Sequence, residues 1–137
     1  MASIDELRNR SVDCLPGTMG IEVVELSPER VVVEMAVKRS LMAPNGYLHA
    51  GSVTALADTA AGYGCEALLP HEAVNFTTIE LKVNFLGTAR EGVLVCISTP
   101  SHVGRTTQIW DSVVSVKETG KRIALFRCTQ MLIYKKG

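Results

Sequence analysis

A carboxylic acid lies near the middle of the most apolar long segment of the sequence. Asp58 lies within residues 50–68, a stretch that is rich in alanine and contains no proline. Burying a carboxylate among alanines costs free energy unless the group is paired, hydrogen-bonded or used in chemistry. Asp58 is therefore a candidate functional residue. The alternative is a buried acid that only holds a structural network together.

A polar loop precedes this segment and could supply the groups that stabilise negative charge. It runs Asn45-Gly46-Tyr47-Leu48-His49-Ala50-Gly51. The first backbone N–H groups of a helix have no partner within the helix and favour an anion. The loop could therefore bind the oxyanion that forms when a carbonyl is attacked. Two purely structural alternatives remain open. His49 could be a hydrogen-bonded loop histidine, and Asn45 could be a turn residue in Pro-Asn-Gly.

Helix geometry limits how Asp58 and the loop could cooperate. Nine positions separate His49 from Asp58, which is about 2.5 turns at roughly 3.6 residues per turn. If both residues are helical, they lie on opposite faces and about 13 Å apart along the axis. A second copy related by a two-fold axis could bring its loop to Asp58. The sequence thus predicts an active site at the interface of a homodimer, present twice in each dimer.

The rest of the pattern predicts six strands around this one long helix. The helix should end at Leu69-Pro70, and its apolar circumference predicts burial on most sides. A short helix over 4–14 is expected, with Ser3 as N-cap, before Pro16-Gly17 breaks the chain. Strands are expected at 21–26, 30–37, 77–85, 93–99, 106–116 and 122–134, with a hairpin turn at 100–104. We therefore predict an α+β fold with one domain over 1–137, a long curved antiparallel sheet wrapped around one central helix.

Composition narrows the class of protein. Of 137 residues, 47% are hydrophobic and 20% charged, which is ordinary for a globular chain and excludes a disordered or fibrous one. Lysine plus arginine and aspartate plus glutamate both number 14, so the basic surplus that nucleic-acid binding needs is missing. No apolar run is long enough for a membrane span, and no targeting segment is visible. Four widely spaced cysteines predict reduced core thiols in a cytoplasmic protein without a metal site.

The loop and the helix resemble a known enzyme family. Tyr47-Leu48-His49-Ala50-Gly51 followed by Leu56-Ala57-Asp58-Thr59-Ala60 closely resembles the His-Gly-Gly…Leu-Ala-Asp motif of hotdog-fold acyl-CoA thioesterases of the phenylacetate-degradation type. Segments 78–86 and 104–106 are also similar to that family, so the resemblance covers nearly the whole chain. It implies the hotdog fold, homodimers that commonly pair into tetramers, and cleavage of an acyl-CoA thioester. It implies no cofactor, since coenzyme A is part of the substrate.

The resemblance also implies roles for individual residues. Asp58 matches the family's catalytic carboxylate, which acts as a general base on water or as a nucleophile. Ala50 matches a glycine whose backbone N–H polarises the thioester carbonyl. His49 matches the histidine that shapes this loop. Thr78 matches a hydroxyl residue that helps to position the water, although by itself it is an ordinary strand residue on the polar side of the 77–85 pattern. In the family, the carboxylate and the hydroxyl come from one subunit and the loop comes from the other.

Three further residues are expected to bind the substrate. Asn45 could replace the Asn or Gln that the family often carries six positions before the histidine, where this chain has Ala43. Gly51 follows Ala50 in the same loop. Arg105 lies where the family often contacts coenzyme A and could pair with a phosphate; the alternative is a solvated surface charge. Ala50 departs from the family's glycine but keeps the N–H that the chemistry needs.

The sequence leaves three functions open and favours one of them. The favoured function is hydrolysis of an aryl- or medium-chain acyl-CoA to a free acid and CoA. A hotdog-fold hydratase or dehydratase would need a catalytic histidine paired with an acid, which the position of His49 fits poorly. A non-catalytic acyl-CoA-binding protein would keep its affinity after Asp58→Asn. A thioesterase would instead lose turnover by about 10²-fold or more.

Overall fold

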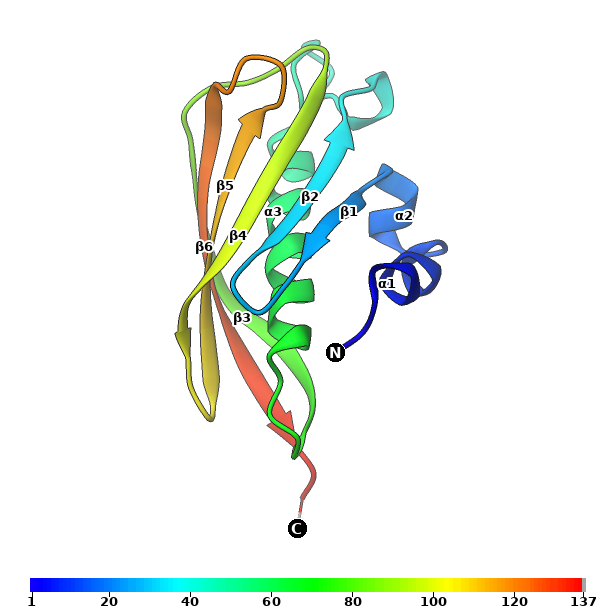
Figure 1. The fold of residues 1–137 in the computed structure, drawn as a ribbon. Helices are drawn as coiled ribbons and strands as arrows, with labels where there is room; N and C mark the ends of the chain where they lie inside the picture. The colour runs from blue at the N-terminus through cyan, green and yellow to red at the C-terminus, as the bar shows by residue number, and fades with distance from the viewer. Residues whose placement is uncertain (137) are drawn as a thin grey trace.

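The computed structural model describes residues 1–136, and one long helix occupies its centre. Helix α3 (Ala50–Ala67) lies along the concave side of an antiparallel sheet (Figure 1). The strands are β1 (Glu22–Leu26), β2 (Val31–Ala36), β3 (Ala73–Phe85), β4 (Val93–Val103), β5 (Thr107–Val116) and β6 (Arg122–Tyr134). Short helices α1 (Ile4–Ser11) and α2 (Leu15–Met19) and a 3-10 turn, η1 (Arg39–Leu41), precede α3. The predicted sheet around one central helix is confirmed.

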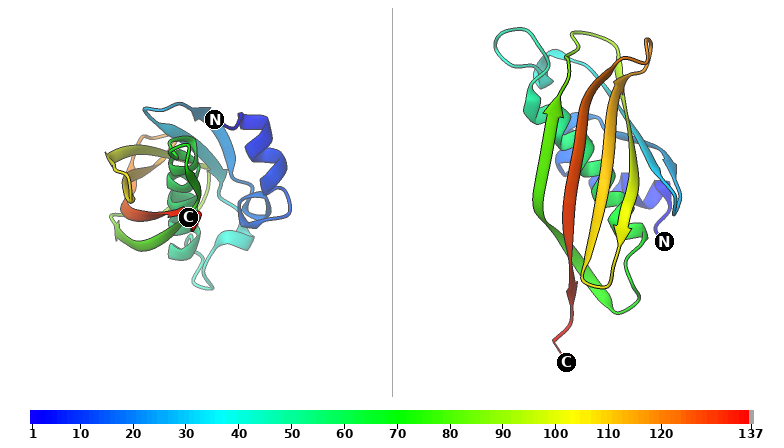
Figure 2. Two further views of the ribbon diagram at one scale, coloured as in Figure 1. Left: turned by 90° about the horizontal axis from the view of Figure 1, so that it is seen from below. Right: turned by 90° about the vertical axis from the view of Figure 1, so that its left-hand side faces the viewer.

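The sheet has the strand order β1-β2-β4-β5-β6-β3, and all neighbouring strands are antiparallel. Seen along the helix, the strands curve around α3 (Figure 2, left). Strand β3 is 13 residues long and lies at one end of this order, hydrogen-bonded to β6 alone. A long strand therefore exposes one unpaired edge directly beside the central helix.

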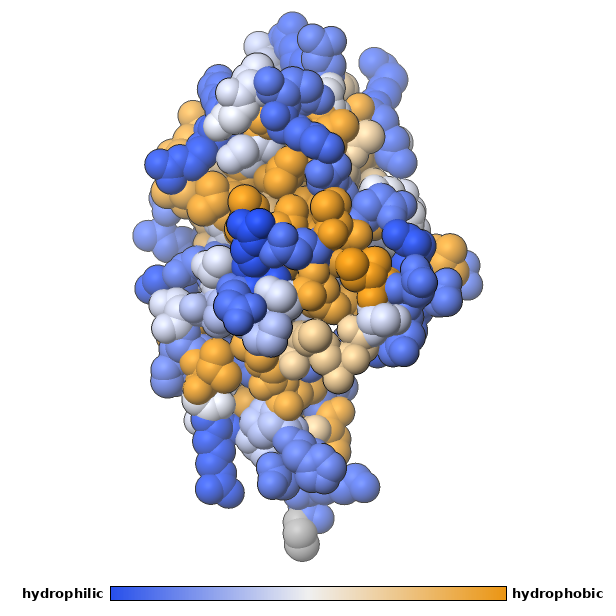
Figure 3. Space-filling model, viewed as in Figure 1, coloured by the Kyte–Doolittle hydropathy of each residue, from blue (hydrophilic) through white to orange (hydrophobic). Residues whose placement is uncertain are grey.

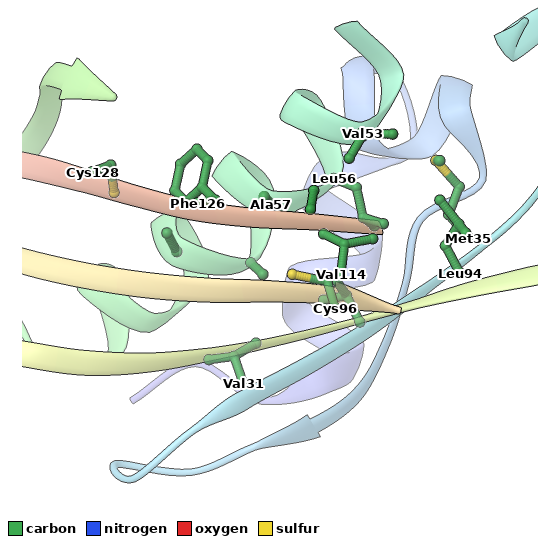
Figure 4. Packing of buried hydrophobic residues seen from close by; sticks show 14 of the residues in the cluster. Val31, Met35, Val53, Leu56, Ala57, Leu94, Cys96, Val114, Phe126 and Cys128 are labelled. Atoms are coloured by element: carbon green, nitrogen blue, oxygen red, sulfur yellow. The ribbon is translucent and has the colours of Figure 1, made fainter. Parts of the chain in front are cut away.

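One face of α3 is packed tightly against the sheet. Figure 4 shows Val53, Leu56 and Ala57 pointing from the helix towards the strands. Small side chains on this face allow close approach, and at Gly64 a Cβ atom would lie only 2.4 Å from the Trp110 ring. The opposite face carries small and polar residues that stay partly open: Gly51, Thr54, Ala55, Asp58, Thr59 and Gly62. The prediction that α3 is buried on most sides is therefore wrong for a single chain.

The N-terminal segment differs from its prediction in one element. Ser3 caps α1 as expected, because its side chain accepts a hydrogen bond from the Glu6 N–H at 3.1 Å. The helix ends at Ser11, however, and Pro16-Gly17 lies inside a second helix instead of breaking the chain. Proline fits the first turn of a helix because its missing N–H would have no partner there. Gly20, with φ of 75°, then ends α2 in the left-handed conformation.

Two strands are longer than predicted. Strand β4 continues to Val103 through Pro100, so the hairpin expected at 100–104 turns at Gly104-Arg105-Thr106 instead. The pairing with β5 shifts by one residue between Pro100 and His102, and such a bulge lets a proline lie in a strand. Strand β3 begins at Ala73, four residues before the predicted start.

The apolar residues divide between the core and one part of the surface. Cys65, Cys96 and Cys128 are buried free thiols, as predicted, whereas Cys14 is exposed, so the prediction of a core position is wrong for it. Within residues 1–136, every helix is too short or too polar to cross a bilayer. On the face shown in Figure 3, apolar side chains gather in the middle, over α3 and its neighbours, between polar ends.

Candidate active site

The structure brings Asp58 and Thr78 together. Asp58 lies near the middle of α3 on its partly open face, and Thr78 approaches it from β3. The Thr78 hydroxyl lies 3.4 Å from Asp58 Oδ1 and 2.7 Å from Oε1 of Gln130, which is on β6. Two of the predicted catalytic side chains thus meet within one chain, at the edge of the sheet.

A β-bulge turns Thr78 towards the helix. Thr78 pairs with Gln130 and Glu80 pairs with Thr129, so Ile79 is one extra residue on β3. An extra residue breaks the alternation of side chains along a strand. Thr78, before the bulge, and Leu81, after it, can therefore face the same side of the sheet. The expectation that Thr78 lies on the polar side of the strand is wrong, because the alternation of residues 77–85 is interrupted at this bulge.

Gln130 is a site residue that the sequence analysis missed. It is fully buried, with 0% of its surface exposed, and its Nε2 lies 3.5 Å from the sulfur of Cys128. A threonine hydroxyl has one proton and cannot donate to both neighbours at once. Gln130 Oε1, at 2.7 Å, therefore competes with Asp58 Oδ1, at 3.4 Å, for this proton and weakens the hydrogen bond that Thr78 donates to Asp58. A lone glutamine in a strand carries no sequence signal that would reveal this role.

Burial controls the electrostatics of Asp58. Partial removal from water raises the pKa of its carboxyl above the usual value, and the Thr78 hydroxyl opposes this shift. Within residues 1–136 no lysine, arginine or histidine forms an ion pair with it. Burial also raises the pKa of the nearby Cys128 thiol to about 12, so that neighbour stays neutral. An unpaired, half-buried carboxylate of raised pKa suits proton abstraction from water.

His49 forms the N-cap of α3 and shapes the loop. Its Nδ1 accepts a hydrogen bond from the Gly51 N–H at 2.7 Å, which places the ring proton of the neutral imidazole on Nε2. A Cβ atom at Gly51 would lie 2.9 Å from this Nδ1, so the cap requires glycine there. The Gly51 N–H is therefore already used. The Ala50 N–H is the exposed donor, without an acceptor in the described chain.

Asn45 and Arg105 lie away from Asp58. Asn45 Oδ1 accepts from the Tyr47 N–H at 3.2 Å, so Asn45 is a turn residue whose side-chain NH₂ stays available. Arg105 lies in the β4–β5 turn, where its carbonyl accepts from the Tyr134 hydroxyl. That turn lies at the C-terminal end of α3, opposite to the loop that precedes the helix (Figures 1 and 2).

The predicted residues line separate hollows in a single chain. Asp58 and Thr78 line a groove of about 380 Å³, which we call the acid groove. Asn45 and Ala50 line a second hollow of about 330 Å³ with Phe85, and His49 and Gly51 line a third. One copy therefore does not join the carboxylate to the loop. Within residues 1–136 no group of three or more histidine, cysteine or acidic side chains is placed to hold a metal ion.

Comparison with known proteins assigns the fold to a family. Residues 45–123 match the thioesterase superfamily. A Bacillus subtilis (strain 168) protein named "Putative esterase ComA2" is 38% identical over 117 residues, which is 85% of this chain and 92% of that protein. The 1,4-dihydroxy-2-naphthoyl-CoA hydrolase of Listeria monocytogenes is 31% identical over 115 residues, covering 84% of this chain and 92% of that one.

Solved structures agree with the fold. The thioesterase PA1618 of Pseudomonas aeruginosa superimposes with a TM-score of 0.92 over 98% of this chain and 96% of that one, at 23% identity. The predicted hotdog fold is thereby confirmed. The chain belongs to the thioesterase superfamily and is a thioester hydrolase.

Proposed function

We propose that this enzyme hydrolyses an aryl- or medium-chain acyl-CoA to a free acid and CoA, as in the phenylacetate-degradation type of thioesterase. The observation that carries the proposal is the unpaired, half-buried carboxylate of Asp58 facing Thr78 at the acid groove. The relative from Listeria is named as the hydrolase of an aryl-CoA, which supports the same substrate class.

Asp58 supplies the base or the nucleophile. As a base, it takes a proton from a water molecule, which attacks the thioester carbonyl and forms a tetrahedral oxyanion. The oxyanion collapses, the C–S bond breaks, and the sulfur of CoA leaves with a proton. As a nucleophile, the carboxylate forms an anhydride that water then cleaves. In either route the hydroxyl oxygen of Thr78, beside Asp58, can accept a hydrogen bond from the attacking water.

The loop before α3 supplies the oxyanion site. The Ala50 N–H is exposed at the positive end of the helix dipole, where a developing negative charge is stabilised. His49 and Gly51 hold this end of the helix by their mutual hydrogen bond. The free NH₂ of Asn45 contacts the thioester side of the substrate, and Arg105 pairs with a phosphate of coenzyme A.

The active site forms between two copies. Asp58 and Ala50 are eight residues apart and line different grooves, so the carboxylate of one copy needs the loop of the other. Two antiparallel α3 helices whose two-fold axis passes Thr54 would place each Asp58 beside the partner's Ala50. The open face of α3 carries small residues there, Gly51 and Ala55 among them, and these allow close approach.

Strand β3 supports the same two-fold axis independently. Thr78 lies beside Asp58, and Phe85 shares a hollow with Ala50. The axis that joins Asp58 to the partner's Ala50 would therefore bring Thr78 towards the partner's Phe85. The unpaired edges of two β3 strands would then meet near Leu81. Leu81 and Phe85 are 42% and 47% exposed in one chain, as expected of apolar residues that a second copy covers.

The remaining features of this proposal concern assembly and location. The dimers pair into tetramers, as the sequence resemblance implies, and the enzyme needs no cofactor besides its substrate. Four free cysteines, three of them buried, suit a reducing compartment such as the cytoplasm.

Thiol release from a panel of aryl- and alkyl-CoA thioesters tests the proposal. The wild type should turn over members of the panel, and Asp58→Asn should lower kcat by about 10²-fold or more while CoA thioesters still bind. Asp13→Asn is a matched control, because it makes the same change at an exposed acid that does not line the acid groove. Binding without turnover by the wild type would overturn the proposal and favour a non-catalytic acyl-CoA-binding protein.

A further inference from the structure

The loop that carries the Ala50 N–H is held on both sides by one residue of α3. The carbonyl oxygen of Leu41, the last residue of η1, accepts two hydrogen bonds. One comes from the His49 N–H at 3.1 Å, and the other comes from the Ser52 hydroxyl at 2.8 Å. The Ser52 N–H in turn donates to the His49 carbonyl at 2.9 Å. Ser52 therefore acts on both polar groups of the His49 backbone, on one of them directly and on the other through Leu41.

These hydrogen bonds fix the direction of the Ala50 N–H. The peptide bond between His49 and Ala50 is planar and trans, so its C=O and its N–H point in opposite directions. Because the His49 carbonyl is directed at the Ser52 N–H, the Ala50 N–H points away from the body of the helix. The bond from the His49 N–H to Leu41 limits rotation on the other side of the same residue. A shift of the Leu41 carbonyl is thus transmitted to the proposed oxyanion donor.

The hydroxyl of Ser52 is not needed to build the helix. Ser52 is the third residue of α3, and its hydroxyl bonds to a carbonyl eleven residues back, outside the helix. Thr54 shows the ordinary alternative, because its hydroxyl bonds at 2.9 Å to the Ala50 carbonyl within the same helix. Only 9% of the surface of Ser52 is exposed, so its hydroxyl is directed at Leu41 and not at solvent. The bond therefore attaches η1 to the first turn of α3.

We propose that Ser52 is a positioning residue for thioester hydrolysis, whose hydroxyl holds the Leu41 carbonyl so that the Ala50 N–H points at the oxyanion. The inference rests on the proposed function and adds to it a residue that acts through the main chain. Without the hydroxyl, the Leu41 carbonyl keeps its bond from the His49 N–H, so no buried polar group loses its last partner. The loop should then keep its fold but lose precision, and a displaced donor stabilises the oxyanion less well.

Two substitutions of Ser52 test this role with the panel of thioesters described above. Ser52→Ala should lower kcat by about tenfold and change KM by less than about twofold, because the direction of the donor matters most in the transition state. Ser52→Cys fills the same space with a much weaker donor and should lose nearly as much. The double variant Ala50→Pro/Ser52→Ala should be no slower than Ala50→Pro, because the N–H through which Ser52 acts is already absent.

A buried serine elsewhere in the chain provides the matched control. Ser98 of β4 is 0% exposed, and its hydroxyl accepts a hydrogen bond from the Ser112 hydroxyl at 2.9 Å. Ser98→Ala should lower the melting temperature without lowering kcat. If Ser52→Ala behaves in the same way, or only raises KM, the inference is wrong. It is also overturned if the losses of Ala50→Pro and Ser52→Ala multiply in the double variant.

Hydrogen exchange separates the failure of this inference from the failure of the proposed function. If the wild type hydrolyses no thioester, the proposed function fails, and amide exchange measured by NMR still decides whether Ser52 holds the loop. Ser52→Ala should speed the exchange of the His49 N–H by about tenfold, because the acceptor of that group is no longer held. The Leu48 N–H, which donates to the Ala89 carbonyl, should exchange as in the wild type. Unchanged exchange at His49 would show that the Leu41 carbonyl is held without Ser52.

Discussion

The two ends of the site are held in different ways. The environment of Asp58 is made by side chains. Burial raises its pKa, Thr78 faces it, and Gln130 accepts a hydrogen bond from Thr78. The loop end is held by backbone groups, with Ala50 offering only its N–H and His49 capping the helix. A side-chain site depends on the identity of each residue. A backbone site tolerates alanine for glycine as long as the N–H and the helix start remain.

Removing the backbone donor should have the largest effect. Ala50→Pro deletes the N–H at the first helical position, where proline is well tolerated. His49 already has φ of −66° and ψ of 135°, which is the conformation that precedes a proline. We expect kcat to fall by about 10²- to 10³-fold with the fold intact. Ala50→Gly, which keeps the N–H, should stay close to wild type; equal losses in both variants would show that the side chain is what matters.

Mixing two inactive variants tests whether the two ends come from different copies. Asp58→Asn and Ala50→Pro should each be nearly inactive alone. Subunits that mix at random give hetero-dimers in which one site carries both lesions and the other carries none, so about a quarter of the wild-type activity should return. Activity is measured after joint refolding of equal amounts. A mixture no more active than its components would place both ends in the same chain.

The hydrogen bonds around Thr78 should control the pH dependence of the reaction. Activity needs ionised Asp58 and should rise with pH through its raised pKa. Thr78→Val removes the group that opposes this rise in pKa, so the acid limb of kcat/KM should move to higher pH. Gln130→Met frees the Thr78 proton for Asp58 and should move the limb to lower pH. The other titratable groups around this groove are unchanged in all variants: Cys128, Tyr63, Glu66 and Arg10.

The double variant provides the control for that network. The acid limb of Thr78→Val/Gln130→Met should lie at the same pH as that of Thr78→Val, because Gln130 acts on Asp58 only through the Thr78 hydroxyl. An acid limb for the double variant that lies midway between the two single variants would show that Gln130 acts by another route.

Stability gives a second readout of the environment of Asp58. A carboxyl whose pKa is raised in the folded protein destabilises the fold as pH rises through that pKa. Asp58→Asn should therefore unfold at a higher temperature than wild type near neutral pH and lose this advantage in acid.

Alanine substitutions of two glycines on α3 should have the smallest effects, and they should change stability in opposite directions. Gly62→Ala adds a methyl group in ordinary contact with Phe76 and gains up to about 1 kcal/mol of helix propensity. It should raise the melting temperature by a few degrees and slow the turnover of bulky acyl groups. Gly64→Ala would place its Cβ 2.4 Å from Trp110 and should destabilise the fold by about 1–3 kcal/mol. Thermal unfolding of both variants checks the pair.

Much of the fold could be predicted because local patterns agree with it. The apolar helix after a capped loop and the alternating strands follow from side-chain periodicity, and Ser3 acts as the predicted cap. The errors fall where the chain departs from a regular period. Pro16 opens a helix although proline usually interrupts one, and Pro100 lies in a strand because a bulge follows it.

Only part of the candidate site could be predicted from the sequence. Asp58 stood out because an acid among alanines needs a reason, and among residues 1–136 no lysine, arginine or histidine forms an ion pair with it. The direction of Thr78 depends on the extra residue Ile79, which alternation alone cannot reveal. Gln130 is distant in sequence and reaches the site only through the pairing of β3 with β6.

The bulge at Ile79 lets β3 hold one extra residue without a change in the orientation of the site. Deleting this single codon would leave Thr78 opposite Gln130 and Glu80 opposite Thr129, so the strand would alternate strictly across this point. One residue would then separate Thr78 from Leu81, and both side chains would still face the same side of the sheet. Straightening the strand with Ile79 kept would instead turn Thr78 away from Asp58 if the segment after the bulge kept its place. Libraries that vary the length of β3 at this position would therefore separate the effect of strand length from the effect of the side chain at position 78.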